Sequence, residues 1–498
     1  MATAVVEERQ LLKSLRWWDG FVIALCNPGF LIAFVGFTMD AVGAWGALFL
    51  WGASSAIGLM QAWIYSETAA MFPDKPGGIS LYAHEGWRGR FSLLGPIGAF
   101  GYWIGWSVVL SIFGKVIGDL VISKWFPTTT WHFTDGVLKG GVTVNDLIGI
   151  GCIVLVWLLN VYGIRPAVWI SYVTGVGLAV PLLVIMLLPY LTGHWHSSNL
   201  QWNLHGFGNS GFGLIMIWLF LNGWSAYGVE VCASFAPEYK NTKRDTAIAL
   251  RTAATFSLLV FVLFPLGLGG EIGAPKAALA EGQYLTGAFS TIVGSGVASF
   301  VVVCLIGSLF LSMISSTADA SRALYGIARD DMTIKQLYRL NRHHVPGRAM
   351  TVDMVVNILL ILFFYSNVAI LYMSNIGYII AHILALTGFL LLRHDRPNWP
   401  RPIKVGAPWL VIAGLLAALN IAFLVYGVSF PALAYATTYR YVYIGFGILV
   451  GSILLFVFRR VVQDKKPITF RDKTPTMPTP EQMALLQDDV VVAGAPRV

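Results

Sequence analysis

Charged residues are scarce in this chain. Lys, Arg, Asp and Glu together make up 12% of its 498 residues, whereas about a quarter of the residues of an ordinary soluble domain are charged. Apolar residues make up 56%, and the mean hydropathy is +0.69. This composition argues against a soluble fold and favours a chain that is largely embedded in a lipid bilayer.

Cysteines are also few, and they have no spacing that metal sites or disulfide frameworks use. All four lie inside apolar segments, and we interpret them as buried packing residues. They are Cys26, Cys152, Cys232 and Cys304.

Several motifs that would indicate other functions are missing. No phosphate-cradling Gly-x-x-x-x-Gly-Lys-Ser/Thr motif occurs, so ATP-driven activity of this chain alone is not expected and no cofactor is predicted. The apolar runs contain no cluster of His, Asp or Glu at catalytic spacing, which argues against a membrane-embedded enzyme. The net charge of +8 does not indicate a nucleic-acid partner, because the basic residues lie in short loops between apolar runs.

The sequence contains many long apolar runs. A helix that crosses about 30 Å of hydrocarbon needs on the order of 20 apolar residues. We predict an all-α membrane protein with about twelve transmembrane helices, and we keep the short ninth run because the charge pattern of the loops requires it. The runs are 21–39, 47–70, 91–122, 144–162, 168–191, 211–235, 247–270, 290–324, 352–365, 369–392, 409–428 and 441–458.

Basic residues gather in the loops on one side of these runs. Cytoplasmic loops carry an excess of Lys and Arg, and the opposite loops hold only Lys124, Lys139, Lys276 and Arg440. We therefore predict a multi-pass protein of the cytoplasmic (inner) membrane with both termini in the cytoplasm. The polar segment from residue 464 onward contains several prolines, and it predicts a disordered or loosely attached extension.

Two of the apolar runs are interrupted near their middle. In the first, Pro28 removes a helical donor and Gly29 relaxes the backbone. In the sixth, Gly223 and Gly228 flank polar and aromatic residues. Such breaks are tolerated where protein or a water-filled cavity supplies hydrogen-bond partners, and paired breaks in two halves point to a central binding site. The alternative is that Pro and Gly merely kink these helices.

Residues at the two breaks are the candidates for binding a small-molecule substrate. Trp224 lies near mid-span, so it is either an aromatic gate or a packing residue. The candidates are Cys26, Asn27, Gly29, Phe30, Asn222, Trp224, Ser225, Tyr227 and Gly228.

The sequence around the second break resembles the amino acid–polyamine–organocation family of permeases. Trp224-x-x-x-Gly228-x-Glu230, followed by Lys240-Asn241-Thr242-Lys243-Arg244, is similar to that family's sixth helix and the loop after it. Further similar segments occur in the family's order at 65–78, 321–330 and 401–405.

This resemblance covers roughly residues 16–404 and implies a leucine-transporter-type fold. The expected architecture is a five-plus-five inverted repeat with broken helices one and six and two extra C-terminal helices. It divides the chain into a tail at 1–17, repeats at 18–192 and 193–396, helices eleven and twelve at 397–462, and a tail at 463–498. The implied function is secondary transport of a small amino acid or amine by alternating access, as a symporter or an exchanger. An inorganic cation or a non-amino carboxylate on the same fold is the alternative cargo, and the oligomeric state stays open.

The chain departs from the family pattern at two positions, one that concerns recognition of the substrate carboxylate and one that concerns the coupling ion. The family usually has Gly-Ser-Gly in helix one, where exposed amides hold a carboxylate, but this chain has Cys26-Asn27-Pro28. Because Pro28 offers no N–H, the Asn27 amide is expected to replace part of that contact. Helix five also lacks the Lys that proton-coupled members use, so the coupling ion, proton or sodium, stays open.

Ionisable residues inside the runs are candidates for gating or coupling. Glu230 could bind a substrate ammonium, carry a proton, or accept hydrogen bonds from amides exposed by the break. Lys115 and Asp119 are four residues apart, which predicts an ion pair within one helix. If Lys115 faces the cavity alone, it would instead favour an anionic group.

Hydroxyl groups in the eighth run are candidates for a sodium site. Sodium-coupled relatives of the same fold place two hydroxyl ligands on this helix, and hard cations prefer oxygen ligands. Ser315 and Ser316 would act together with carbonyls near Leu25 and Gly29. The alternative is that these hydroxyls bond back to their own helix.

Overall fold

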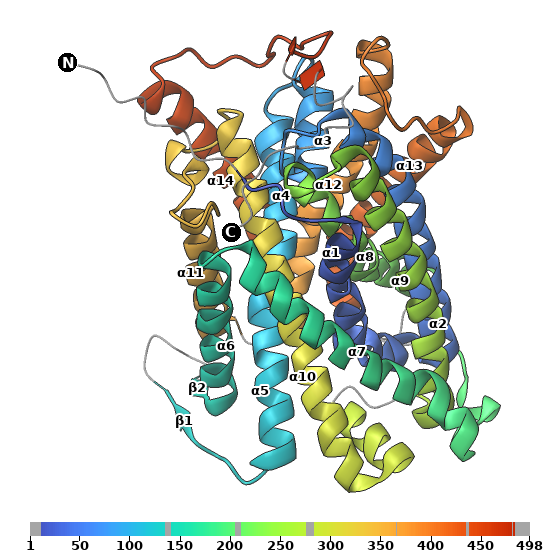
Figure 1. Cartoon of the computed structure of the whole chain (residues 1–498). Helices are drawn as coiled ribbons and strands as arrows, with labels where there is room; N and C mark the ends of the chain where they lie inside the picture. The colour runs from blue at the N-terminus through green and yellow to red at the C-terminus, as the bar shows by residue number, and fades with distance from the viewer. Residues whose placement is uncertain are drawn as a thin grey trace.

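The computed structural model describes residues 11–134, 141–204, 211–274, 283–364, 366–434, 438–480 and 482–483. Lys139 and Lys276, two of the four basic residues predicted in outer loops, lie outside this part of the chain. Within it the regular structure is helical apart from one antiparallel pair, β1 (His132–Phe133) with β2 (Val142–Thr143). Figure 1 shows most helices running along one common direction as a bundle.

The helices follow the predicted runs to within about seven residues, except α3, which matches no predicted run. In chain order they are α1 (Trp17–Ala24), α2 (Cys26–Met71), α3 (Gly78–Trp87), α4 (Leu94–Ser107), α5 (Val109–Trp125), α6 (Val144–Val161), α7 (Ile164–Thr192), α8 (Gly211–Ala226), the 3₁₀ helix η3 (Gly228–Glu238), α9 (Thr242–Ile272), α10 (Gln283–Arg329), α11 (Gly347–Phe363), α12 (Asn367–Asp395), α13 (Pro408–Ser429) and α14 (Tyr439–Phe458). Short helical turns lie at Ser197–Asn199, Lys335–Tyr338, Pro431–Leu433 and Arg459–Gln463.

Ten helical stretches in the described residues are long and apolar enough to cross a membrane. The predicted all-α membrane fold is therefore confirmed. The stretch Trp17–Met71 has 55 residues, about 80 Å of helix, which is too long for one crossing. It contains two of the predicted runs, whereas the 17-residue α11 matches the short ninth run. The number of crossings and the inverted repeat stay predictions.

The long α2 changes direction at Gly43, whose φ of 78° lies in the left-handed region. A β-carbon at this position would overlap the carbonyl oxygen of Gln201, so only glycine fits. The segment after α7 closes over this turn, because Asn203 N donates to Val42 O at 2.9 Å and Trp45 N donates to Gln201 O at 3.1 Å. The turn between the first two predicted spans is thus held by the loop that precedes the sixth.

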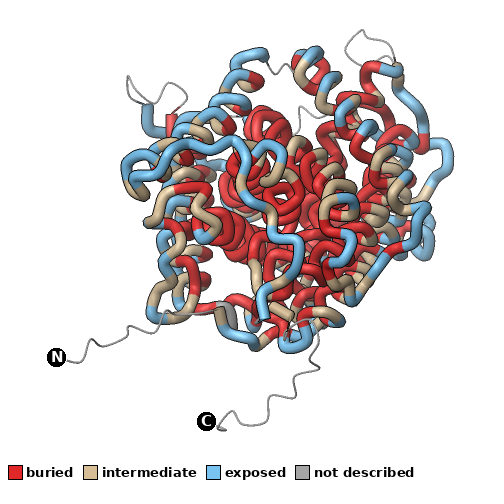
Figure 2. Tube along the Cα trace, turned by 90° about the horizontal axis from the view of Figure 1, so that it is seen from above, coloured by how far each residue is buried: buried red, intermediate tan, exposed pale blue. Residues whose placement is uncertain are grey.

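The interrupted helices lie at the centre of the bundle. Figure 2 shows buried residues gathered in the middle and exposed ones around the edge. The apolar windows of Trp17–Met71, Leu94–Trp125 and Gly211–Glu238 are each 83% buried, whereas those of α6 and α14 are 28% buried. The first, third and sixth predicted runs are therefore surrounded by protein, and the peripheral helices face the lipid.

Residues 464–480 are mostly exposed, as a loosely attached extension would be, but they contact the body of the protein at several points. The Phe470 ring stacks on Phe91, with centroids 6.1 Å apart and an interplanar angle of 9°. Ser92 N donates to Phe470 O and Asp472 N donates to Arg88 O, both at 2.8 Å. Contacts to an already folded surface stabilise a segment whose own composition could not, and composition alone does not reveal them.

Candidate functional site

The sixth predicted span breaks where the sequence indicates. Helix α8 ends at Ala226, Tyr227 forms a turn, and the chain continues as η3 from Gly228. A β-carbon on Gly228 would lie 2.7 Å from the Asn27 side-chain oxygen. Glycine at this position therefore lets the first and sixth spans approach each other.

The break in the first span is smaller than predicted and lies one residue earlier. Helix α1 ends at Ala24 and α2 begins at Cys26, with only Leu25 between them at φ −63° and ψ −8°. Pro28 has no N–H to give the carbonyl of Ala24, but Leu25 N still donates to Phe21 O at 3.0 Å. The expected break at Asn27–Gly29 is wrong, because these residues lie in the first turn of α2.

An aromatic pair closes the space between the two breaks. The rings of Phe30 and Trp224 stack with centroids 5.0 Å apart and an interplanar angle of 25°. The Trp224 indole N–H also donates to Gly105 O at 2.7 Å, which ties α8 to α4. Both aromatic residues are buried, so this pair fills the centre of the bundle.

Several polar groups at the same level have a free hydrogen-bonding position. Asn27 donates to Ser257 on α9 at 3.3 Å, while its side-chain oxygen has no partner. The side-chain nitrogen of Asn222, the Ser225 hydroxyl and the Tyr227 hydroxyl are buried and likewise without a partner. Buried polar groups normally find partners, so this set is suited to a polar ligand.

The cavity beside the aromatic pair is small. It measures about 10 Å³, roughly the space that one water molecule needs. A solute of amino-acid size therefore requires the surrounding helices to move apart. The cavity is lined by residues that include Phe34, Trp51, Asn222, Trp224, Ser225 and Leu371.

Glu230 connects η3 to two other helices. Its carboxylate accepts from Tyr378 on α12 at 2.6 Å and from the Trp106 indole on α4 at 3.1 Å. The His382 ring nitrogen lies 3.9 Å away, and the other nitrogen of that ring is 3.0 Å from the Tyr65 hydroxyl. The second Glu230 oxygen is buried without a partner. Side chains rather than exposed helix amides thus provide these contacts.

The structure does not bring Lys115 to the breaks. Lys115 donates to Phe364 O at 3.2 Å and lies 3.9 Å from Asp146 on α6. The Asp119 carboxylate accepts from Asn145 instead. The predicted ion pair within one helix is therefore replaced by one between helices, because α6 packs its acidic first turn against this face of α5.

The serines predicted to bind sodium differ in their surroundings. Ser316 donates to the backbone of Ser312 at 2.7 Å, as the alternative interpretation expects. Ser315 has a buried hydroxyl without a partner. The contact to the first span comes from Ser312, which donates to Cys26 O at 2.8 Å. In the described residues no three His, Cys, Asp or Glu side chains group as metal ligands, and a sodium site stays a prediction.

Among the fully buried ionisable residues that were not identified as candidates, Asp319 and His382 lie next to the two breaks. Asp319 on α10 accepts from Tyr102 at 3.2 Å, and His382 lies in the Glu230 cluster. Both are ionisable residues inside predicted membrane runs, and that position could have identified them as candidates.

Buried ion pairs join three segments at one end of the bundle, and these segments are far apart in the sequence. Arg322 on α10 pairs with Glu238 at the end of η3 at 2.5 Å, and both side chains are buried. Glu67 near the end of α2 pairs with Arg393 at 2.6 Å and with Arg401 at 3.1 Å. Lys75 also lies 3.1 Å from Asp330, so segment 65–78 contacts both 401–405 and 321–330.

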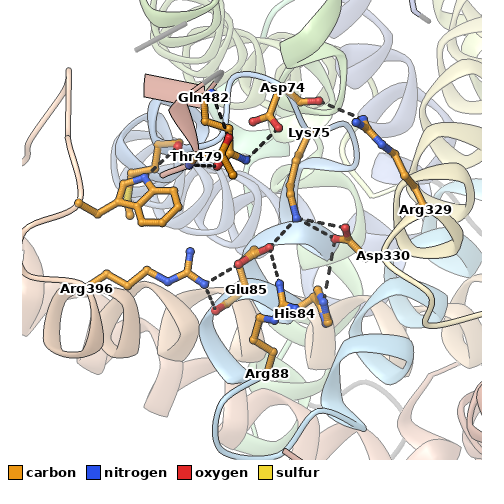
Figure 3. A network of polar contacts seen from close by, with 12 residues as sticks. Asp74, Lys75, His84, Glu85, Arg88, Arg329, Asp330, Arg396, Thr479 and Gln482 are labelled. Carbon is orange, nitrogen blue, oxygen red and sulfur yellow. Dashed lines mark hydrogen bonds and ion pairs between the residues drawn. The ribbon is translucent and has the colours of Figure 1, made fainter. Parts of the chain in front are cut away.

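A second ionic network lies at the same end, around Glu85 of α3 (Figure 3). Lys75 lies 2.7 Å from Glu85 and 3.1 Å from Asp330, and Arg396 lies 2.6 Å from Glu85. Burial alone would raise the pKa of Glu85, but Lys75, Arg396 and Arg88 hold it well below its usual range. Glu85 is thus a carboxylate that holds α3 to the ends of α10 and α12.

The family model described as amino acid permease matches residues 15–453. This chain belongs to the amino acid permease family. The match extends beyond every segment on which the resemblance was based, and it confirms that resemblance.

Relatives of this permease include two antiporters and a further permease. An arginine/ornithine antiporter of Pseudomonas aeruginosa is 24% identical over 335 residues, 65% of each chain. The amino-acid permease RocE of Bacillus subtilis is 24% identical over 393 residues, 73% of this chain and 76% of the relative. A cadaverine/lysine antiporter of Escherichia coli is 27% identical over 271 residues, 51% of this chain and 54% of the relative. The match thus spans less than two thirds of either antiporter.

Proposed function

We propose that this permease is a secondary active transporter that moves a small amino acid or amine across the cytoplasmic membrane by alternating access. The observation that carries the proposal is the stacked pair Phe30–Trp224 between the two helix breaks, surrounded by buried polar groups without partners. The names of the relatives, which refer to arginine, ornithine, lysine and cadaverine, support this class of substrate.

In the proposed cycle, substrate separates the aromatic pair. The Trp224 face suits an ammonium or an apolar side chain, and the free positions of Asn27, Asn222 and Ser225 suit polar groups. The present conformation is closed, since the cavity beside the pair holds no more than about one water. Binding therefore favours a conformation in which α2 and η3 have moved apart.

The buried ion pairs act as the inner gate in this proposal. Glu238 lies at the end of η3 and Glu67 near the end of α2, in the second predicted run, while their partners Arg322 and Arg393 lie on α10 and α12. Opening that end of the bundle requires these pairs to separate. The basic loops support a cytoplasmic position for this end and for both termini.

Reconstitution into proteoliposomes tests the proposal. Uptake of labelled L-arginine, L-ornithine, L-lysine, cadaverine and agmatine would be measured under an imposed proton or sodium gradient. We expect saturable uptake of at least one of them, and stimulation by internal unlabelled substrate would indicate exchange. Rubidium flux without uptake of any amine, or uptake of a carboxylate without an amino group, would contradict the amine assignment.

The position of the site has its own test. We expect Asn27→Ala to raise KM at least tenfold, because it removes a polar group beside Gly228. Asn420→Ala is the matched control, since Asn420 is equally buried but donates only to its own helix at 2.8 Å. Equal kinetics for the two variants would mean that the site lies elsewhere.

A further inference from the structure

We infer that Asp319 binds the coupling proton of the transport cycle, together with Glu230, through a bridge of two tyrosines. The inference rests on the proposed transport function and names the ion that drives it. It starts from the position of Asp319 on α10, where its side chain is fully buried.

Asp319 has an incomplete set of partners. One carboxyl oxygen accepts from the Tyr102 hydroxyl at 3.2 Å, and the other is buried without a partner. Arg322, one turn further along, is already held by Glu238 at 2.5 and 2.9 Å and by the carbonyl of Ala318 at 2.8 Å. A carboxylate inside a membrane protein is costly without a cation of its own. A bound proton removes that cost.

Two stacked tyrosines connect Asp319 with Glu230. The rings of Tyr102 and Tyr378 have centroids 6.1 Å apart and an interplanar angle of 29°. The Tyr102 hydroxyl lies at Asp319, and the Tyr378 hydroxyl donates to Glu230 at 2.6 Å. Each carboxyl group keeps one unpartnered oxygen. The cluster thus offers two places for a proton, one on α10 and one on η3.

The cluster also touches both interrupted spans. On α10, Ser312 lies two turns before Asp319 and donates to Cys26 O in the first turn of α2. Ser234 of η3 lies 3.4 Å from the Tyr102 hydroxyl. Any movement of α2 and η3 away from α10 therefore changes the surroundings of Asp319. If the affinity of Asp319 for a proton differs between the two conformations, proton binding is coupled to the movement of α2 and η3.

Proton rather than sodium fits the donors at Asp319. The side-chain hydroxyls that contact its carboxyl group in the described residues are those of Tyr102 and Ser234, and both are hydrogen-bond donors that suit a carboxyl group. The titratable and charged groups around the two carboxyls come from all the helices packed on them. They are Cys26 and Tyr65 of α2, Tyr102 of α4, Tyr227 before η3, Cys232 and Glu238 of η3, Arg322 of α10, Asp353 of α11, and Tyr378 and His382 of α12.

Transport by reconstituted full-length protein tests this inference. For whichever amine the wild type takes up, we expect an inward proton gradient to stimulate accumulation at least fivefold. Asp319→Asn should abolish that stimulation while keeping exchange of labelled against unlabelled substrate. The matched control is Asp353→Asn, because Asp353 is equally buried, accepts from Trp103 at 3.1 Å and also has an unpartnered oxygen. This control should keep the stimulation.

Other outcomes would overturn the inference. They are proton stimulation that survives in Asp319→Asn, stimulation by sodium alone, or loss of exchange together with stimulation in a monodisperse Asp319→Asn protein.

Asp319→Glu, which keeps the carboxyl group, should restore part of the stimulation. Infrared spectra supply a readout without substrate, since Asp319→Asn should remove a carbonyl stretch of a protonated carboxyl group. If the wild type transports no amine, the proposed function fails, and an unchanged spectrum would separately exclude a proton on Asp319.

Discussion

Arg322→Met tests the inner gate because it leaves one member of a buried ion pair without its partner. The Arg322 guanidinium contacts both oxygens of Glu238, at 2.5 and 2.9 Å, and both side chains are almost fully buried. It also lies 4.5 Å from the centre of the Phe235 ring. Removing one partner of such a pair typically costs about 3–5 kcal/mol, because the remaining charge stays buried and uncompensated.

The assay is a double-mutant cycle read by thermal unfolding of the purified protein in detergent. Arg322→Met and Glu238→Gln should each destabilise the protein, and the double variant should recover most of the loss, since two neutral side chains then face each other. Arg90→Met is the control for a surface pair. Arg90 lies 2.8 Å from Asp395, but the two side chains are 46% and 27% exposed, so its loss should cost about 1 kcal/mol or less.

Equal shifts for Arg322→Met and Arg90→Met would refute this reasoning. So would additive losses in the double variant, because they would show that the two side chains do not stabilise each other. If the pair is also the inner gate, variants that still fold should expose the region near Glu238 more often. Faster labelling of a cysteine introduced there would measure that opening.

Three further predictions concern the turn, the α3 network and the C-terminal segment. Gly43→Ala should lower the free energy of unfolding by at least about 1 kcal/mol, because the φ of this residue is +78°. Gly414→Ala is the control and should be neutral or slightly stabilising, since a β-carbon there meets nothing within 4 Å. Thermal unfolding of the two variants compares these effects. Glu85 has a folded-state pKa below its usual range, so its contribution to the free energy of unfolding is full at neutral pH and is lost as the pH falls toward that pKa. Glu85→Gln should therefore make stability depend less on pH on the acid side of a stability–pH profile. Phe470→Ala should speed proteolysis within residues 465–480, since it removes the stack on the α3–α4 connection; an unchanged cleavage rate would contradict that docking.

Periodic and local signals in the sequence were reliable where one physical requirement dominates. A helix in hydrocarbon must satisfy every backbone group internally, so long apolar runs had to become helices, and each predicted run did. The break after Ala226 was equally predictable, because glycines flank it and no other residue allows Asn27 to approach so closely.

Predictions about side chains failed where the partner came from another part of the chain. Lys115 and Asp119 share a helix face, yet both find partners on α6. Pro28 suggested an unwound stretch, but one missing N–H costs a single hydrogen bond and the flanking residues stay helical. Residues 464–480 looked unable to fold alone, and composition does not reveal their contacts to the connection between α3 and α4.

The sequence by itself determined the class of this protein, the helices, the position of the second break and the family, because all of these depend on hydropathy or on residues close together along the chain. Only the tertiary structure decided which polar groups meet. The stacking of Phe30 on Trp224, the Glu238–Arg322 pair and the tyrosine bridge from Asp319 to Glu230 each join helices distant in sequence. Such contacts depend on how helices rotate and pack against one another, and spacing within one helix carries no information about that.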